Sequence, residues 1–180
     1  MIVCAGRNEL FDFAQPIGVG LVESASNLTK IILEHSPKFL FFIGTAGSYG
    51  KYSLFDIFYA HQATNIELGF LDNHCYTPLN NSISAKTPYV SRETNIIVNS
   101  SNYITTHPIS AEKLQNKGIS LENMEFFSVL SVANQFNIPC TGLFIVTNYC
   151  NENAHSDFIN NHSKAKELLT LHVKQLFEEL

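Results

Sequence analysis

The first candidate for a functional residue is a glutamate in the stretch SLENMEFFSVLSVANQF, residues 120–136. Helical spacing of about 100° per residue places Glu125 on one arc with the apolar residues Leu121, Val129, Val132 and Phe136. An acidic residue in a first helical turn also favours the positive helix end, but this explains the sign of Glu125 and not its direction. A carboxylate that points toward a core needs a partner. Because arginine is scarce in this chain, the hydroxyl groups of a ligand could be that partner.

Small residues end a second apolar run, in the stretch FFIGTAGSYG. Gly44, Thr45, Ala46 and Gly47 would let a ligand approach exposed backbone N–H groups. On this stretch alone, an ordinary tight turn is the simpler explanation.

Two further polar positions lie where strands are expected to end. Glu9 follows the first apolar run, and Thr147 with Asn148 closes the run LFIVTN. Open α/β sheets bind ligands at the carboxyl ends of their strands, so these positions are candidate site residues. Taken by itself, Glu9 is more simply a solvated surface glutamate. Asn148 is unusual at such a place because a carboxamide cannot act as a general acid.

Neither a metal nor a dinucleotide is expected. His61 and His74 have no metal-ligand spacing to a second His or Cys. The stretch GVGLVESA, residues 18–25, lacks the third glycine of a dinucleotide fingerprint. His155 and Asp157 fit an ordinary helix start. We therefore expect no metal and no cofactor.

Composition limits the possible partners. The 180 residues are 45% hydrophobic and 15% charged, which is typical of one soluble globular domain. The net charge is −5 and the only arginines are Arg7 and Arg92, so nucleic acid is not an expected partner. The four cysteines form no C-x-x-C pair and no secretory signal is recognisable, which favours a reduced, cytoplasmic protein. Apolar runs are shorter than the roughly 20 residues of a membrane-spanning helix.

Several elements can be predicted that would position these residues. Apolar runs at 1–6 and 16–22 indicate strands, and a helix capped by Ser24 is expected to end at His35. The run KFLFFIG, residues 38–44, indicates a central strand covered on both faces, which completes the strand-helix-strand unit of a parallel sheet. The rest of the pattern predicts strands and a loop in 52–101, a helix at 120–136, a strand at 141–147 and an amphipathic helix at 154–180.

Together these stretches resemble the nucleoside phosphorylase and nucleosidase superfamily, especially its methylthioadenosine/S-adenosylhomocysteine nucleosidases. The strongest elements are GTAG at a strand end, the Met-Glu pair in ENMEFF, and the polar pair in LFIVTNYCNENAHSDF. SSNYIT, residues 100–105, is a weaker match to the family's G-D-x-F-I stretch, since both lead residues differ. The resemblance covers nearly the whole chain and implies one α/β domain over 1–180, with three layers and a mixed central sheet flanked by helices.

The resemblance implies a purine nucleoside lying across the carboxyl ends of the sheet. Glu9 falls where the nucleosidases keep the glutamate that activates the attacking water, and Glu125 would hold the ribose hydroxyls. Tyr103 falls where the family stacks an aromatic ring on the base. The other implied substrate contacts are Thr45, Ala46, Gly47, Asn123, Met124 and Thr147.

Two departures from the family pattern bear on the reaction. Hexameric phosphorylases place a phosphate-binding arginine where this chain has Phe42, so the resemblance favours hydrolysis over phosphorolysis. Arg7 is the nearby candidate for phosphate, which would be the co-substrate of a phosphorylase. The nucleosidases have an aspartic acid where this chain has Asn148, so protonation of a departing adenine should suffer.

An amide at position 148 can serve a different base. Its carbonyl can accept from N7–H while its NH₂ donates to a 6-oxo group, which matches hypoxanthine or guanine. Trimeric purine nucleoside phosphorylases resemble this chain in having Thr-Asn here, and futalosine hydrolase is a further analogue. We therefore expect a hydrolase that prefers 6-oxopurine nucleosides. The alternatives are a phosphorylase, or a binding protein that kept the pocket and lost the catalyst.

The resemblance also implies a homo-oligomer, with a dimer favoured. A neighbouring subunit often completes the nucleoside site in this superfamily. The stretch 61–70 is a candidate for that contact.

Overall fold

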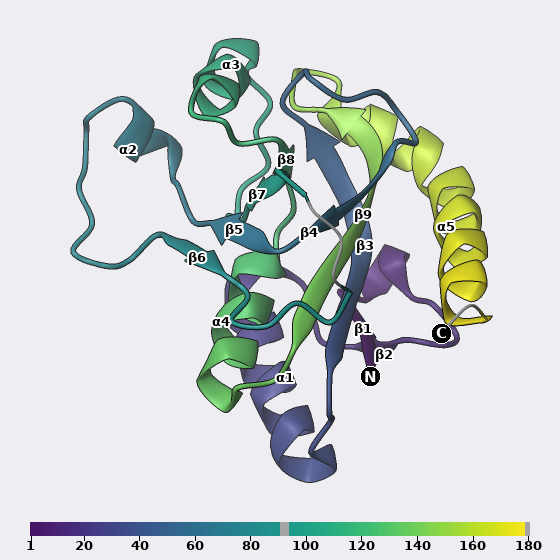
Figure 1. The fold of residues 1–180 in the computed structure, drawn as a ribbon. Helices are drawn as coiled ribbons and strands as arrows, with labels where there is room; N and C mark the ends of the chain where they lie inside the picture. Colours follow the sequence, from purple (N-terminus) through teal and green to yellow (C-terminus); the bar gives the residue numbers. More distant parts are fainter. Residues whose placement is uncertain (91–93, 179–180) are drawn as a thin grey trace.

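The structure is a computed structural model that describes residues 1–90 and 94–178 (Figure 1). In chain order its elements are β1 (Ile2–Cys4), η1 (Arg7–Glu9), β2 (Gln15–Pro16), α1 (Gly20–His35), β3 (Leu40–Ser48), β4 (Ile57–Ala60), β5 (Gln62–Thr64), α2 (Leu68–Leu71), β6 (Ser82–Ser84), β7 (Ile97–Asn99), α3 (Pro108–Asn116), β8 (Leu121–Glu122), α4 (Phe126–Phe136), β9 (Cys140–Tyr149) and α5 (Ala154–Glu178).

Two long strands, β3 and β9, form the centre of a mixed sheet. They run parallel, from Leu40 opposite Cys140 to Ala46 opposite Val146. The other edge of β3 is shared: β1 pairs with its first half in parallel, and β8 pairs with its last two residues in antiparallel. β9 continues the sheet to β4, while β8 continues it through β7 to β5. Since β4 leads into β5 through His61, the two arms of the sheet are joined by the chain itself.

Helices cover the sheet on both faces. α1 and α4 lie on one face and α5 lies along the other (Figure 1). β3 is buried along its whole length, and β9 is buried except at its last residue. Strands covered on both sides need apolar residues on both sides, which explains the continuous apolar runs that marked these two strands in the sequence. The expected α/β fold with a mixed sheet between helices is confirmed.

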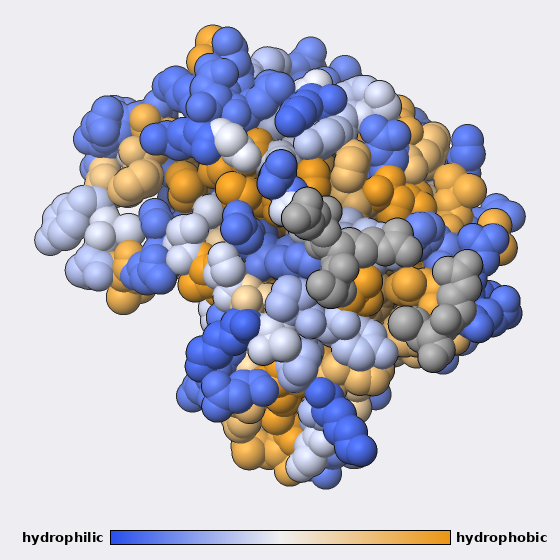
Figure 2. Space-filling model, viewed as in Figure 1, coloured by the Kyte–Doolittle hydropathy of each residue, from blue (hydrophilic) through white to orange (hydrophobic). Residues whose placement is uncertain are grey.

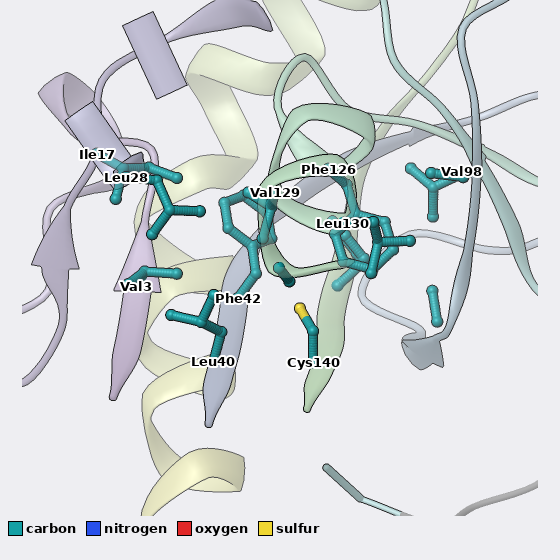
Figure 3. Close-up of a cluster of buried hydrophobic side chains, with 14 of the residues drawn as sticks. Val3, Ile17, Leu28, Leu40, Phe42, Val98, Phe126, Val129, Leu130 and Cys140 are labelled. Atoms are coloured by element: carbon teal, nitrogen blue, oxygen red, sulfur yellow. The ribbon is translucent and has the colours of Figure 1, made fainter. Parts of the chain in front are cut away.

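Phe42 belongs to the core between β3 and the α1/α4 layer. It is fully buried, and its ring lies 6.0 Å from that of Phe126 and 5.7 Å from that of Phe144, centroid to centroid. Figure 3 shows it among apolar side chains of both helices. The residue at the position of the phosphate-binding arginine therefore contributes to packing and lies within the core.

The expected strand at 16–22 and the cap at Ser24 are wrong. β2 has only two residues, and α1 already begins at Gly20, which has positive φ, as does Gly18 before it. The Ser24 hydroxyl instead donates to the Gly20 carbonyl inside the helix. The first free N–H groups of α1 are satisfied from far along the chain, because Gly20 N–H donates to Glu125 and Leu21 N–H to Asn102. Local sequence could not reveal such partners.

The expected helix at 120–136 is shorter than predicted. Residues 121–122 form β8, and α4 begins only at Phe126. Asn123 lies between the strand and the helix. Its side-chain Oδ1 accepts the N–H groups of Glu125 and Phe126 and so satisfies the backbone donors at the helix start.

The remaining predicted elements are present within the described residues. Strands β4 to β7 occupy the region 52–101, of which 91–93 lie outside the described residues. The strand predicted at 141–147 runs on to Tyr149, and the C-terminal helix extends to Glu178, with 179–180 outside the description. Across residues 1–90 and 94–178, no helix is both long and apolar enough to span a bilayer. Hydrophilic and hydrophobic residues are intermixed on the face shown in Figure 2.

Candidate active site

A cavity of about 250 Å³ opens where β1, β3 and β9 end. Its walls come from seven parts of the chain, with these lining residues: 6–9, Val19, 45–47, Ile104, 122–125, Asn148, and Ala154, His155 and Phe158 at the start of α5. The structure therefore brings together all but two of the residues predicted for the site. The two that do not line the cavity are Tyr103 and Thr147.

The floor of the cavity depends on an irregularity between the two central strands. The β3–β9 register shifts between Ala46 and Gly47, so Gly47 lies opposite Asn148 instead of Thr147. A Cβ atom added to Gly47 would lie 2.8 Å from Cys150 Sγ and 3.0 Å from Asn148 Nδ2. Only glycine leaves room there for both side chains, which explains the small residue at this strand end.

Glu9 is held against the backbone of β3. The chain turns out of β1 through Gly6 and Arg7, which have φ of 118° and 54°, and places Glu9 in the short helix η1. The Thr45 N–H donates to Glu9 Oε1 at 2.6 Å. Burial raises the pKa of Glu9 above its usual value, and the hydrogen bonds from Thr45 only partly oppose this. A carboxylate of this kind can accept a proton from a bound water.

Glu125 is the second carboxylate of the cavity and is only 2% exposed. The N–H of Gly20, the first residue of α1, donates to Glu125 Oε1 at 2.9 Å. Burial raises the pKa of Glu125 to about 8, and the nearby charge of Glu9 adds to the rise. The predicted burial of Glu125 is confirmed, but its carboxylate meets the positive end of α1 and not that of its own helix.

Asn123 and Met124 complete the wall beside Glu125. The Asn123 amide donates from Nδ2 to the Thr45 carbonyl at 3.1 Å, in addition to capping α4 through Oδ1. This side chain therefore joins β3 to the start of α4. Met124 is partly exposed and faces the cavity.

Asn148 lines the cavity and is 6% exposed. Its Oδ1 accepts the hydroxyl of Thr147 at 2.9 Å, and its Nδ2 donates to the Tyr149 carbonyl at 3.2 Å. Thr147 is fully buried behind it. The structure thus places Thr147 as a support for the Asn148 amide.

Tyr103 does not lie in the cavity, contrary to the placement that the resemblance implied. Its side chain is 75% exposed, whereas the next residue, Ile104, forms part of the wall. Asn102 is held by α1 and Thr105 by Glu122, so the two residues between these anchors take opposite sides.

Sequence reasoning missed several residues of the wall. Phe158 follows His155 by three residues, so both face the same side of α5 at its start. That spacing was a usable signal, because a helix that follows β9 directly must begin beside the cavity. Glu122 and Ile104 gave no such signal, since their positions depend on contacts between distant segments.

The cavity offers little to a metal or a phosphate dianion. Within the described ranges no group of three His, Cys, Asp or Glu residues is placed to hold a metal ion. Arg7 lines the cavity, but its side chain is 71% exposed and lies 3.5 Å from a carboxylate oxygen of Glu23. Two neighbouring carboxylates with raised pKa values suit a ligand that carries hydroxyl groups or gains positive charge.

Glu125→Gln is expected to make the free energy of unfolding less dependent on pH. The pKa of Glu125 is about 8 in the fold against 4.5 for an ordinary glutamate. Between these values the folded protein keeps a proton that the unfolded chain releases. Stability from this group is therefore fully present below 4.5 and is lost as pH rises through about 8. Denaturant titrations across this window should show a flatter profile for the variant.

Glu34→Gln is the matched control, because Glu34 is exposed and lies outside the cavity lining. Its pH profile should follow that of the unmodified protein. Glu9 and Glu122 also have raised pKa values, so the slope in Glu125→Gln should shrink without vanishing. A slope equal to that of the control would contradict the burial of an ionisable Glu125.

Comparison with known proteins agrees with this geometry. A family model described as the phosphorylase superfamily matches residues 2–178. No curated protein sequence gives a significant match. A Helicobacter pylori 5′-methylthioadenosine/S-adenosylhomocysteine nucleosidase mutant, with 5′-methylthioadenosine in its active site, has a TM-score of 0.81 at 18% identity over 99% of this chain and 97% of that chain.

Two other solved structures share the fold. Native futalosine hydrolase of Helicobacter pylori has a TM-score of 0.80 at 20% identity, over 99% of this chain and 97% of that chain. The 5′-methylthioadenosine/S-adenosylhomocysteine nucleosidase of Neisseria meningitidis, in complex with methylthio-immucillin-A, has a TM-score of 0.75 at 14% identity over 92% and 80%. The resemblance inferred from the sequence is confirmed, and the protein belongs to the phosphorylase superfamily.

Proposed function

We propose that this protein hydrolyses the N-glycosidic bond of purine nucleosides. The observation that carries the proposal is a pair of carboxylates, the partly exposed Glu9 and the buried Glu125, in one small cavity at the strand ends. Structural relatives with nucleosidase and futalosine hydrolase activities support the same reaction type. The cavity is large enough for a ligand of modest size, and both Asn148 and Phe158 line it.

In the proposed reaction Glu9 acts as general base. Glu9 takes a proton from a water molecule, whose oxygen bonds to C1′ of the ribose. The bond from C1′ to the purine nitrogen breaks and its electron pair leaves with the base, which takes a proton on N7 from solvent water, since an amide cannot act as a general acid. A base that is itself raised in pKa toward neutral pH is well suited to this proton transfer. Positive charge develops on the sugar, and oxygen atoms of Glu9 and Glu125 in the cavity would stabilise it.

Glu125 would bind the ribose. Its Oε1 already accepts from Gly20, which leaves Oε2 for a sugar hydroxyl. With a pKa of about 8, the carboxyl group can donate as well as accept near neutral pH. Met124 would pack against the sugar ring beside it.

Asn148 would recognise the leaving base. An amide can accept from N7–H and donate to a 6-oxo group, and the hydroxyl of Thr147 orients it. We therefore propose that inosine-like nucleosides are better substrates than adenosine-like ones. Tyr103, although exposed, stays a candidate for contact with the base, since it adjoins Ile104 in the cavity wall.

A phosphorylase is the second candidate, and the position of Arg7 at the cavity is the observation in its favour. Phe42 argues against it, because the place of a phosphate-binding arginine is filled by a buried ring. In either case the reaction would need no metal or organic cofactor. A phosphorylase would consume inorganic phosphate.

Incubation with a panel of purine nucleosides should release free base at the same rate with and without phosphate. The expected products are the base and ribose, because water is the proposed nucleophile. Liquid chromatography of the reaction mixture measures both. Acceleration by phosphate with accumulation of ribose 1-phosphate would instead establish the phosphorylase. Tight binding of purines without any release of base would identify a binding protein.

We further propose that the protein acts as a homodimer in a reducing, cytoplasmic setting. All four cysteines are free, and three of them are buried. The apolar side chains of Tyr103 and Ile104 are 75% and 50% exposed beside the cavity, where a second subunit could cover them. The stretch 61–70 leads into α2 and remains a candidate for the same contact.

A further inference from the structure

A third carboxylate, which is buried, borders the cavity and has no role in the reaction described above. Glu122, the last residue of β8, is 6% exposed. Its Oε1 accepts from the Thr105 N–H at 2.8 Å and from the Cys150 thiol at 3.8 Å. Its Oε2 accepts from the Tyr49 hydroxyl at 2.9 Å and from the hydroxyl of Thr105. A carboxylate has about four acceptor sites, so these neutral donors occupy all of them.

The donors are kept in their protonated forms. Burial, followed by the charge of Glu122, raises the pKa of the Tyr49 phenol and of the Cys150 thiol well above their usual values. Both groups therefore remain donors at neutral pH. Burial likewise raises the pKa of Glu122, although the hydrogen bonds from Thr105 and Tyr49 oppose the rise. Glu122 thus joins segments that follow β3, β7 and β9.

Of the three donor residues, Thr105 directly follows a residue of the cavity wall, Ile104. The segment from Asn102 to Thr105 has two anchors. At one end Asn102 Oδ1 accepts the Leu21 N–H at 2.9 Å, and at the other Glu122 accepts both donors of Thr105. The two residues between the anchors are Tyr103 and Ile104, which is the residue that lines the cavity.

The sheet places Glu122, which anchors this segment, in one row with Asn148. Gly47 pairs with Glu122 on one side and with Asn148 on the other, so the three residues form one row across β8, β3 and β9. Neighbouring strands lie about 4.8 Å apart, so the row spans about 10 Å. A ligand group recognised by Asn148 would therefore lie close to the segment that Glu122 anchors.

We propose that Glu122 is a positioning residue that holds the segment Asn102–Thr105 against the base end of the nucleoside cavity. Glu122 acts through Thr105 and does not itself touch the reacting atoms. Ile104 forms a fixed apolar wall for the purine only while Thr105 is held at both its N–H and its hydroxyl. The location of the purine base at this end of the cavity rests on the proposed function, whereas the anchoring of the segment by Glu122 does not.

A single tryptophan can report on this segment, because the chain contains none. In a Tyr103→Trp background, Glu122→Ala should lower the fluorescence anisotropy of the tryptophan and weaken hypoxanthine binding about tenfold, the loss expected for a hydrogen bond to a charged group. Glu122→Gln should lose less than about threefold, because its amide oxygen can still accept the Thr105 N–H. In turnover, KM should rise while kcat stays nearly unchanged.

The matched control is Thr64→Val, which removes another buried hydrogen bond, from the Thr64 hydroxyl to Asn99 Oδ1 at 2.8 Å, outside the cavity lining. It should change neither anisotropy nor binding. If Glu122→Ala does not fold, Thr105→Val takes its place and should give the same signs with smaller size. Equal effects in the Glu122 and Thr64 variants, or unchanged anisotropy without Glu122, would overturn the proposal. Fluorescence and base binding need no turnover, so a lack of nucleoside cleavage would refute only the proposed function.

Discussion

Glu9→Gln is expected to slow nucleoside hydrolysis by about 10²- to 10⁴-fold, the range that general base catalysis contributes. A glutamine keeps an oxygen that can accept the Thr45 N–H, so the fold of η1 should persist. It cannot take a proton from water, and the attacking nucleophile is then not activated. Nucleoside binding should change little, because Glu125 and Asn148 still provide their contacts.

The measurement compares kcat for base release with the Kd of the nucleoside. Glu34→Gln, on the exposed face of α1 and outside the cavity lining, is the control for loss of one negative charge. It should leave both quantities unchanged. Normal turnover in Glu9→Gln would dismiss the role of this residue and, with it, the carboxylate pair as the basis of the proposed function.

The pH dependence of turnover is a second test of the role of Glu9. Since burial raises the pKa of Glu9, the base form accumulates at higher pH than it would for an ordinary glutamate. The acidic limb of the rate profile therefore reports this ionisation, together with that of Glu125. Two carboxylates in one cavity titrate as a pair, so the limb belongs to both.

The central architecture was predictable because burial leaves a strong mark on sequence. β3 and β9 are covered on both faces, so their sequences are nearly continuous apolar runs. α5 shows the apolar spacing of a helix with one buried face. Where an element begins was less predictable. α1 begins at Gly20 because Glu125 and Asn102 accept its first N–H groups, and neither residue is near it in sequence.

The residues of the candidate site were likewise predictable only in part. Residues at strand ends, such as Glu9 and Asn148, could be named because parallel strands bring their carboxyl ends together. Glu125 was named from a helical arc that included Leu121, which is in fact part of β8, so its burial was predicted on a partly wrong geometry. Tyr103 and Ile104 depend on the anchors at Asn102 and Glu122, which no local pattern reveals.

Asn148→Asp is expected to raise turnover of adenosine-like nucleosides by about 10²-fold and to reduce or reverse the preference for inosine-like ones, because a carboxylic acid can protonate a departing adenine and an amide cannot. The carboxylate would also lose the donor that an amide offers to a 6-oxo group. The side chain is 6% exposed, so desolvation would raise the pKa of the new acid above that of an ordinary aspartic acid, and a hydrogen bond from the Thr147 hydroxyl would partly oppose the rise.

The experiment compares kcat/KM for inosine and adenosine in both proteins, with Asn160→Asp on the exposed surface of α5 as a control for the added charge. The control should keep the original preference. Equal turnover of both nucleosides by the unmodified protein, or an unchanged preference in Asn148→Asp, would remove base recognition from Asn148. The Asn148 amide would then be only a structural link between Thr147 and Tyr149. A gain on adenosine would instead show that the cavity retains every other element of a nucleosidase and that one amide sets its choice of base.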